Sequence, residues 1–200
     1  MDSHRIDELV RFYQKFSGEE RRHKPTAIGC YRPTRIEALR ELFDRLHGEG
    51  FLQPFDVFLD AGGGDARAAA LAALYDLRSY SVEGDYHTHT LAEQRIARLR
   101  REGILEDAAR QEYPVLAYGD FLDMRTYVQL RLRPQAIDMV FNGGDNETAL
   151  ARFMKQHMRQ KPAYLILTQS SGSLVEQELS LVEVYHGSQG DYLGKIFSAN

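Results

Sequence analysis

Cysteine, long apolar runs and excess positive charge are all scarce in this sequence of 200 residues. The single cysteine, Cys30, excludes an internal disulfide framework and a metal site built from several thiolates, and it fits a reducing compartment. No apolar run approaches the roughly 18 residues that cross a membrane, and the N-terminus lacks the basic and then apolar order of a signal peptide. We therefore expect a cytoplasmic protein with no membrane partner.

Charged residues make up 27% of the chain and give a formal net charge of −4. Proteins that bind nucleic acid mainly through electrostatics usually carry the opposite sign, so we do not expect a nucleic acid as a partner. With 43% hydrophobic residues the chain can bury a core without disulfides, and its length predicts a single globular domain.

Segments typical of strands and of helices alternate after residue 54. Strands are expected at 55–60, 78–83, 114–118, 136–142 and 163–168, with helices between them at 65–76, 87–102, 121–130 and 147–160. Two more strands, 179–186 and 191–198, flank the turn Gly187-Ser188-Gln189-Gly190 and predict a C-terminal hairpin. Two helices, 4–16 and 34–48, are expected before the first strand.

This alternation predicts an α/β fold with a seven-stranded, mostly parallel, doubly wound sheet that ends in a C-terminal antiparallel hairpin. We expect residues 1–50 to form an N-terminal helical extension that covers the site as part of the same domain. Residues 51–200 are expected to form a Rossmann-like cofactor-binding unit.

Three consecutive glycines follow the first strand, in the stretch FDVFLDAGGGD over residues 55–65. A glycine turn between a strand and a helix exposes backbone N–H groups near the positive end of a helix dipole, where a ligand can bind. Gly62 and Gly64 are therefore expected to let a cofactor approach the backbone. Glu83, at the end of the second strand, is placed to accept hydrogen bonds from both hydroxyls of a ribose.

Two classes of ligand fit these features, dinucleotides and S-adenosylmethionine. The dinucleotide fingerprint G-x-G-x-x-G needs a third glycine for close packing of helix and strand, and Arg67 stands there instead. Asp65 at the start of the helix also suits a phosphate-free ligand better than a pyrophosphate. A nicotinamide-dependent oxidoreductase is therefore the less favoured alternative.

Four short motifs carry a resemblance to a known family. They are Asp60-Ala61-Gly62-Gly63-Gly64, Val82-Glu83-Gly84-Asp85, Gly119-Asp120-Phe121 and Asp138-Met139-Val140-Phe141-Asn142. In this order and spacing they resemble the class I, seven-stranded S-adenosylmethionine-dependent methyltransferases, over most of the chain. The resemblance implies that S-adenosyl-L-methionine is the cofactor, with its methionine end at the glycine turn.

The resemblance also implies roles for other strand ends. Asp60 would order the glycine turn or accept a hydrogen bond from the ammonium group of the cofactor. Asp120 would accept a hydrogen bond from the adenine amine, and Phe121 would pack on the base. From the residues alone, Asp120 could instead cap the helix expected to begin at Phe121.

A narrower resemblance concerns the acceptor. Tyr31-Arg32-Pro33-Thr34 and Gly119-Asp120-Phe121-Leu122 look like the disruptor-of-silencing branch of protein-lysine methyltransferases, which places a Y-x-P segment before the first motif. After the fourth strand, Asn142-Gly143-Gly144-Asp145 departs from the N-P-P-Y loop that stacks a flipped base, which counts against base methylation. The acceptor is left as a lysine amine of a protein or a small-molecule nucleophile.

Methyl transfer from a sulfonium is an in-line displacement, which needs alignment and exclusion of water and requires no metal. We expect Asn142, with Tyr31 nearby, to position the acceptor, and Gly143-Gly144 to leave room for its approach. The alternative from another class is a non-catalytic module that keeps the fold and the cofactor. The unusual loop after the fourth strand favours that alternative.

Overall fold

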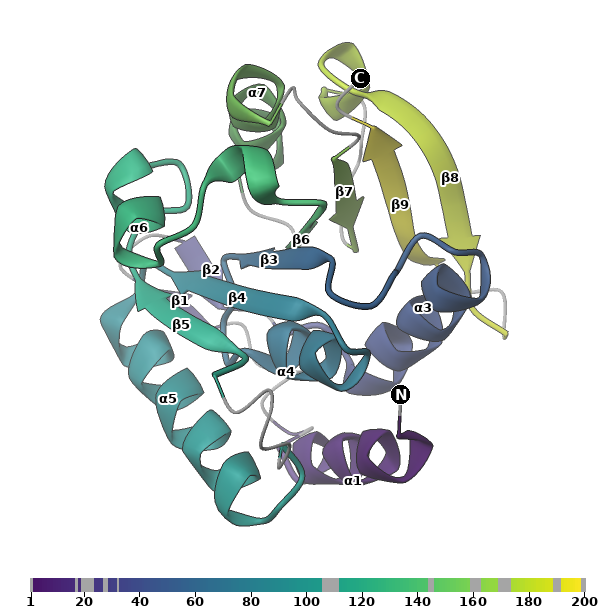
Figure 1. Cartoon of the computed structure of the whole chain (residues 1–200), viewed down its shortest axis with the longest axis vertical. Coiled ribbons are helices and arrows are strands. Elements are labelled where there is room, and N and C mark those ends of the chain that lie inside the picture. Colours follow the sequence, from purple (N-terminus) through teal and green to yellow (C-terminus); the bar gives the residue numbers. More distant parts are fainter. Residues whose placement is uncertain are drawn as a thin grey trace.

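A computed structural model of the chain describes residues 2–16, 18, 24–26, 29–31, 33–105, 112–143, 146–158, 163–168, 174–188 and 192–198 (Figure 1). The main sheet contains β3 (Val57–Ala61), β4 (Arg78–Glu83), β5 (Val115–Tyr118), β6 (Met139–Asn142), β7 (Tyr164–Leu167), β8 (Ser180–His186) and β9 (Tyr192–Ser198). Its seven strands lie in the order β5-β4-β3-β6-β7-β9-β8. Strands β3 to β7 are parallel and β9 and β8 join them antiparallel, which confirms the predicted sheet.

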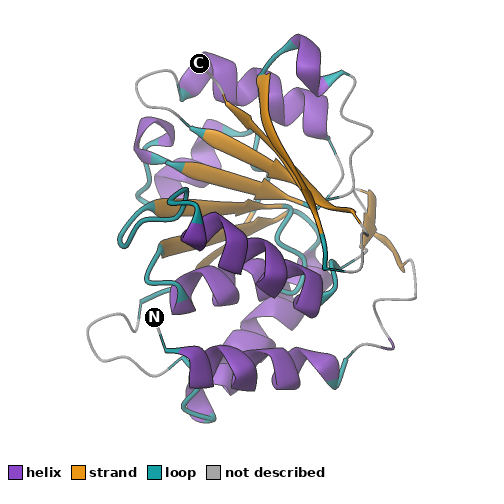
Figure 2. Ribbon diagram, turned by 90° about the vertical axis from the view of Figure 1, so that its right-hand side faces the viewer, coloured by secondary structure: helices purple, strands orange, loops and turns teal. Residues whose placement is uncertain are grey.

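Helices cover both faces of this sheet (Figure 2). On one face lie α1 (Ser3–Gln14), α3 (Ile36–Gly48), α4 (Arg67–Leu74) and α5 (Tyr86–Arg101). On the other lie α6 (Met124–Gln129), α7 (Glu147–His157) and the 3₁₀ turns Pro134–Ala136 and Val175–Gln177. The fully buried strand β3 joins the two layers, because Phe58 packs into the first core while Val57 and Leu59 pack into the second.

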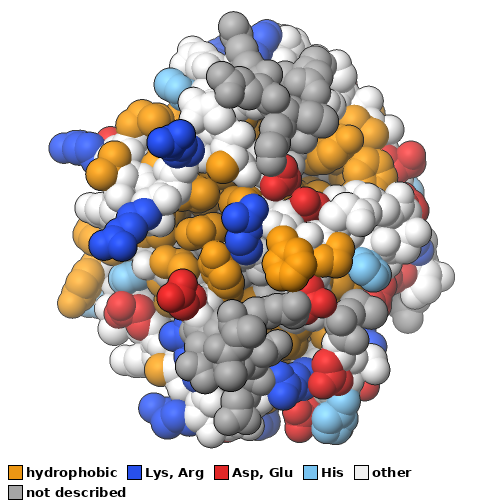
Figure 3. All heavy atoms as spheres, in the orientation of Figure 1, with side chains coloured by type: hydrophobic (Ala, Val, Ile, Leu, Met, Phe, Trp, Pro, Cys, Tyr) orange, Lys and Arg blue, Asp and Glu red, His pale blue; other side chains and the backbone are white. Residues whose placement is uncertain are grey.

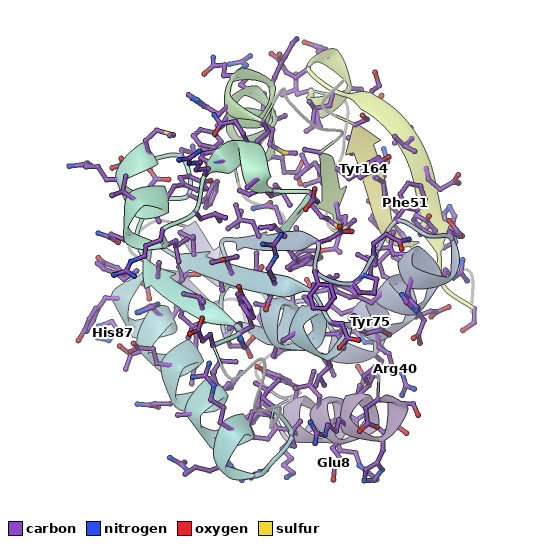
Figure 4. All side chains as sticks on the ribbon, viewed as in Figure 1. Glu8, Arg40, Phe51, Tyr75, His87 and Tyr164 are labelled. Carbon is purple, nitrogen blue, oxygen red and sulfur yellow. The ribbon has the colours of Figure 1, made fainter. Side chains whose placement is uncertain are left out.

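The N-terminal helices are packed into this domain. Apolar side chains of α1 and α3, Leu9 and Leu42 among them, are buried in the same core as the sheet. At the surface, Arg40 of α3 pairs with Asp7 of α1, and the Tyr75 hydroxyl at the end of α4 donates to Asp44 of α3 (Figure 4). The helices therefore hold a fixed position against α4, which begins at the candidate site.

Between α1 and α3 the chain also forms a short antiparallel hairpin, β1 (Lys24–Thr26) and β2 (Gly29–Tyr31). The two predicted helices are present, and the segment between them adds a hairpin that the sequence did not predict. Strands of three residues are too short to show an alternating pattern. The hairpin lies toward the carboxyl ends of the parallel strands (Figure 1).

Two of the predicted elements begin three residues later than expected. The strand expected over 136–142 begins only at Met139, because Pro134–Ala136 forms a 3₁₀ turn. The helix expected from residue 121 begins at Met124, because Asp123 is its N-cap and accepts a hydrogen bond from the Arg125 N–H at 2.9 Å.

The surface mixes charges of both signs. Figure 3 shows Lys and Arg side chains interspersed with Asp and Glu over the face in view. Among the helices that the structure describes, none is both long enough and apolar enough to span a bilayer.

The strand order reverses between β3 and β6, because β4 and β5 follow on one side of β3 while β6 and β7 lie on the other. Doubly wound sheets bind ligands at such a switch point, outside the carboxyl ends of the strands. Here the two strands end side by side, with Ala61 paired to Asn142. The glycine turn leaves β3 at this place.

Candidate functional site

The glycine turn is folded back onto the end of β4. The N–H groups of Gly62 and Gly63 both donate to the main-chain oxygen of Val82, at 3.0 and 2.9 Å. The backbone is left-handed at Gly62 (φ 77°) and Gly64 (φ 55°), a conformation that costs other residues energy, and Ala66 adopts it as well (φ 60°). The turn is therefore fixed by hydrogen bonds before any ligand binds.

Gly63 is needed for a different reason. A Cβ atom at this position would lie 1.8 Å from Ser81 Oγ, 3.1 Å from Ser81 Cβ and 3.2 Å from Asp60 Oδ2, so even a methyl group requires the Ser81 side chain or the turn to shift. The sequence reasoning singled out Gly62 and Gly64 and missed Gly63. Its requirement comes from Ser81 on the neighbouring strand, a contact that a single sequence does not reveal.

Glu83 meets the glycine turn, as its position after the second strand predicts. Its Oε2 accepts from the Gly64 N–H at 2.9 Å and its Oε1 from the Asp85 N–H at 2.7 Å. Only 8% of the residue is exposed, and burial raises the pKa of the carboxyl above its ordinary value. A carboxylate has about four acceptor positions, so Glu83 can still accept from a further donor such as a ribose hydroxyl.

Phe121 lies against the same turn. A Cβ on Gly62 would be 3.8 Å from Phe121 Cε1 and 3.7 Å from Asn142 Nδ2, so the bare glycine lies between an aromatic ring and an amide. Asp120 is exposed and does not cap α6; its Oδ1 accepts from the Leu122 N–H at 2.8 Å in a turn that precedes the helix. The carboxyl ends of β3, β4, β5 and β6 thus bring most of the predicted site residues together.

Asn142 is buried at the switch point. Its Nδ2 donates to the main-chain oxygen of Ala61 at 2.7 Å, which ties β6 to the residue before the glycine turn. The sequence did not predict this hydrogen bond between Asn142 and the residue before the glycine turn.

The backbone of Tyr31 lies in β2, opposite Lys24, and its side chain is outside the described residues. The segment that follows it reaches the strand ends, because Thr34 Oγ1 lies 3.3 Å from Thr168 Oγ1 after β7. Gly143 is next to this contact, and residues 144 and 145 of the predicted acceptor loop lie outside the described residues.

Comparison with known proteins bears on this arrangement. No family model matches the chain, and no curated protein matches it. Among solved structures, a variant of the nicotianamine synthase MtNAS superposes with a TM-score of 0.62 at 12% identity, over 98% of this chain and 67% of that one. A second structure of an MtNAS variant is a complex with S-adenosylmethionine.

Two other solved structures are named as methyltransferases. The O-methyltransferase from Bacillus cereus, in complex with SAH, has a TM-score of 0.55 at 16% identity, over 99% of this chain and 90% of that one. A putative sarcosine dimethylglycine methyltransferase from Galdieria sulphuraria has a TM-score of 0.57 at 16% identity, over 89% and 76%. The chain has the fold of the S-adenosylmethionine-dependent methyltransferases. It spans about two thirds of the length of MtNAS.

Within this methyltransferase fold, Asp60 lies buried between the glycine turn and the first turn of α4. The residue is 2% exposed, and its carboxyl accepts from the Ala69 N–H in the first turn of α4. The N-cap of that helix, Ala66, has no side chain that can do so. Oδ2 has no hydrogen-bond partner among the described residues, and burial, with the charge of Glu83, raises the pKa of Asp60 to about 7.

The pKa of Asp60 predicts a pH-dependent stability. The folded protein keeps this proton up to pH of about 7, whereas the unfolded chain loses it near its ordinary pKa of 3.8, so stability falls as pH rises through this window. Asp60→Asn, which cannot ionise, should lack this fall and should melt several degrees above the native protein at pH 8, a difference of about 2–4 kcal/mol. At pH 5 the difference should shrink to about 1–2 kcal/mol, because the unfolded chain is already ionised above pH 3.8 while the folded protein is still protonated.

Thermal unfolding followed by circular dichroism between pH 5 and 8 measures this difference. Asp123→Asn is the control, because the Arg125 side chain holds the pKa of this half-buried carboxyl below its ordinary value, outside the window. The prediction is contradicted if the melting temperatures of the native protein and of Asp60→Asn change in parallel as the pH rises from 5 to 8.

The sequence reasoning missed a buried ion cluster beside the turn. Asp65 contacts both Arg67 of α4 and Arg95 of α5, and all three residues are at most 3% exposed. One signal was available: Arg95 lies on the apolar stripe of α5, with Ala92 and Leu99. No group of His, Cys, Asp and Glu side chains suited to a metal ion occurs in the described part of the chain.

Proposed function

We propose that this chain binds S-adenosylmethionine across the ends of β3, β4 and β5 and transfers its methyl group to a nucleophile at the end of β6. The contact of the Glu83 carboxylate with the Gly64 N–H carries the proposal, because it joins the predicted ribose acceptor to the glycine turn at the switch point. The bare Gly62, between Phe121 and Asn142, provides space that a side chain would fill. The residues present therefore fit the cofactor.

In this proposal each strand end has one task. Gly62 and Gly64 admit the methionine end of the cofactor, and Glu83 accepts from its ribose hydroxyls. Asp120 and Phe121 take the adenine, through the exposed carboxylate and the aromatic ring. Asp60 orders the turn through α4, consistent with its buried position.

The bound cofactor supplies an electrophilic methyl group, and the protein has to align the acceptor and exclude water. Asn142 ends β6 beside the glycine turn and Gly143 follows it, and Tyr31 precedes the segment that contains Thr34. We assign the acceptor to this side, with Asn142 and Tyr31 as the residues that position it. A protein lysine, as in the disruptor-of-silencing branch, and a small-molecule nucleophile are the two acceptor classes proposed.

Isothermal titration tests the cofactor assignment. S-adenosylmethionine and S-adenosylhomocysteine should bind the native protein, and nicotinamide nucleotides should not. A radiolabelled-methyl assay against proteins and small molecules, with the adenosyl product identified by mass spectrometry, tests the transfer. Release of S-adenosylhomocysteine supports methyl transfer, whereas any other adenosyl product would show that a different group is transferred.

Asn142→Ala separates the acceptor role from the cofactor role. The substitution removes one hydrogen bond to Ala61, about 1 kcal/mol, so the affinity for S-adenosylmethionine should fall by no more than about fivefold. The rate of methyl transfer should fall by about 100-fold, because the acceptor loses its alignment. Titration gives the first number and the methyl assay gives the second.

A second candidate function, a non-catalytic module that binds the cofactor, is favoured by one observation. The hydrogen bond from the Asn142 amide nitrogen to the main-chain oxygen of Ala61 gives this side chain a structural role that needs no acceptor. If affinity and rate fall by the same factor in Asn142→Ala, the residue serves the glycine turn alone. Cofactor binding without methylation of any tested acceptor would support the module.

A further inference from the structure

Arg67, the first residue of α4, links two parts of the chain that are distant in sequence. Its Nε and Nη2 donate to the two carboxylate oxygens of Asp65, each at 2.9 Å, and its Nη1 donates to the main-chain oxygen of Thr34 at 2.8 Å. Asp65 follows the glycine turn directly, and Thr34 lies between β2 and α3. One rigid guanidinium therefore sets the distance between the turn and this segment.

Asp65 is held from two further directions. Arg95 of α5 pairs with its Oδ2, and the hydroxyl of Tyr13 in α1 donates to its main-chain oxygen at 3.2 Å. Burial raises the pKa of Tyr13, so this hydroxyl keeps the proton that it donates. The Tyr13 ring also lies 5.1 Å from the Arg67 guanidinium, a cation–π distance. Asp65 therefore cannot shift without disturbing α1, α4 and α5 together.

Thr34 borders the opposite side of the site. Its Oγ1 contacts Thr168 after β7, and a Cβ on Gly143 after β6 would lie 3.7 Å from the same oxygen. The segment thus runs along the ends of β6 and β7, where the proposed function places the acceptor. Arg67 reaches from the cofactor side of the switch point to the acceptor side.

Stability is a weak explanation for this buried cluster. Desolvation of buried ion pairs offsets most of their attraction, and apolar side chains of similar volume often serve a fold equally well. The Arg67 guanidinium, however, bonds a carboxylate on one side and a main-chain oxygen on the other, and so it fixes the relative position of these two groups. We propose that Arg67 is a positioning residue that couples the glycine turn to the Thr34 segment, so that cofactor binding orders the acceptor side; this rests on the proposed function.

Amide hydrogen exchange, read by mass spectrometry on the full chain, tests the coupling. In the native protein, saturating S-adenosylhomocysteine should slow exchange at residues 62–66 and also at residues 33–36. Arg67→Lys keeps the positive charge and loses the planar guanidinium that bonds Asp65 and Thr34 together. In this variant the ligand should still slow exchange at 62–66 and no longer at 33–36, with its Kd raised by no more than about tenfold.

Arg95→Lys is the matched control, because Arg95 also holds Asp65 while the bond to Thr34 comes from Arg67. The ligand effect at 33–36 should persist in this variant. In the methyl assay, Arg67→Lys should raise KM for the acceptor more than KM for S-adenosylmethionine, a difference that a general loss of stability does not produce.

Three results are decisive against these assignments. Loss of the effect at 33–36 in both variants would overturn the specific role of Arg67. If bound ligand does not slow exchange at residues 33–36 in the native protein, the native protein alone overturns the coupling. Failure of S-adenosylmethionine and S-adenosylhomocysteine to bind the native protein would overturn the proposed function first.

Discussion

Gly63→Ala is expected to lower the free energy of unfolding by about 3 kcal/mol, the upper end of the range for overpacked positions. The added Cβ would lie 1.8 Å from Ser81 Oγ and 3.1 Å from Ser81 Cβ in a buried part of the sheet, so the Ser81 hydroxyl, the turn or the strand has to move. A loss of this size lowers the melting temperature of a chain of this length by about 6–12 °C. Because the displaced turn is the proposed methionine site, titration should also show a loss of S-adenosylmethionine affinity of more than about tenfold.

A second substitution isolates the cause. Ser81→Gly removes both the Oγ and the Cβ that the new methyl group would meet, so Gly63→Ala with Ser81→Gly should melt above Gly63→Ala alone. Gly62→Ala is the control, because its cost comes from a left-handed backbone and a glycine at position 81 should not relieve it. No recovery in the double variant would show that the overlap with Ser81 is not what makes Gly63 necessary.

Local patterns were enough to predict the layout of the sheet. Short apolar runs that end at glycine or an acidic residue, separated by helical periods, predicted the strands from β3 to β9 and the meeting of Glu83 with the glycine turn. Such patterns depend on a few neighbouring residues and on the rule that parallel strands end at one edge. They predict which strand ends meet.

Contacts between distant segments were not predictable in the same way. The pairing of Asp65 with Arg95 and the close approach of Gly63 to Ser81 depend on how α5 and β4 pack against the turn. Arg67 illustrates the limit, since in the sequence it counted only against a dinucleotide. In the fold its guanidinium is bonded to Asp65 and to Thr34, which lies far away in the sequence.

Glu83→Gln is expected to weaken S-adenosylmethionine binding by about 10- to 100-fold, the loss of charge-assisted bonds worth about 1.5–3 kcal/mol. The two carboxylate oxygens accept from Gly64 and Asp85, and an amide can serve only one of these donors because its nitrogen would face the other. The melting temperature should therefore fall by a few degrees as well, and affinity has to be measured by titration well below it.

The ligand itself identifies the contact. If Glu83 accepts from the ribose, the native protein should bind a 2′,3′-dideoxy analogue of S-adenosylhomocysteine about 10- to 100-fold more weakly than the parent, while Glu83→Gln should barely distinguish the two. Asp85→Asn controls for charge, because it removes a neighbouring negative charge and an asparagine can still cap α5 through Thr88. If Asp85→Asn and Glu83→Gln weaken S-adenosylmethionine binding equally, the loss of affinity comes from local charge. Equal binding of the analogue and the parent by the native protein would remove Glu83 from the ribose and leave it as a support of the glycine turn.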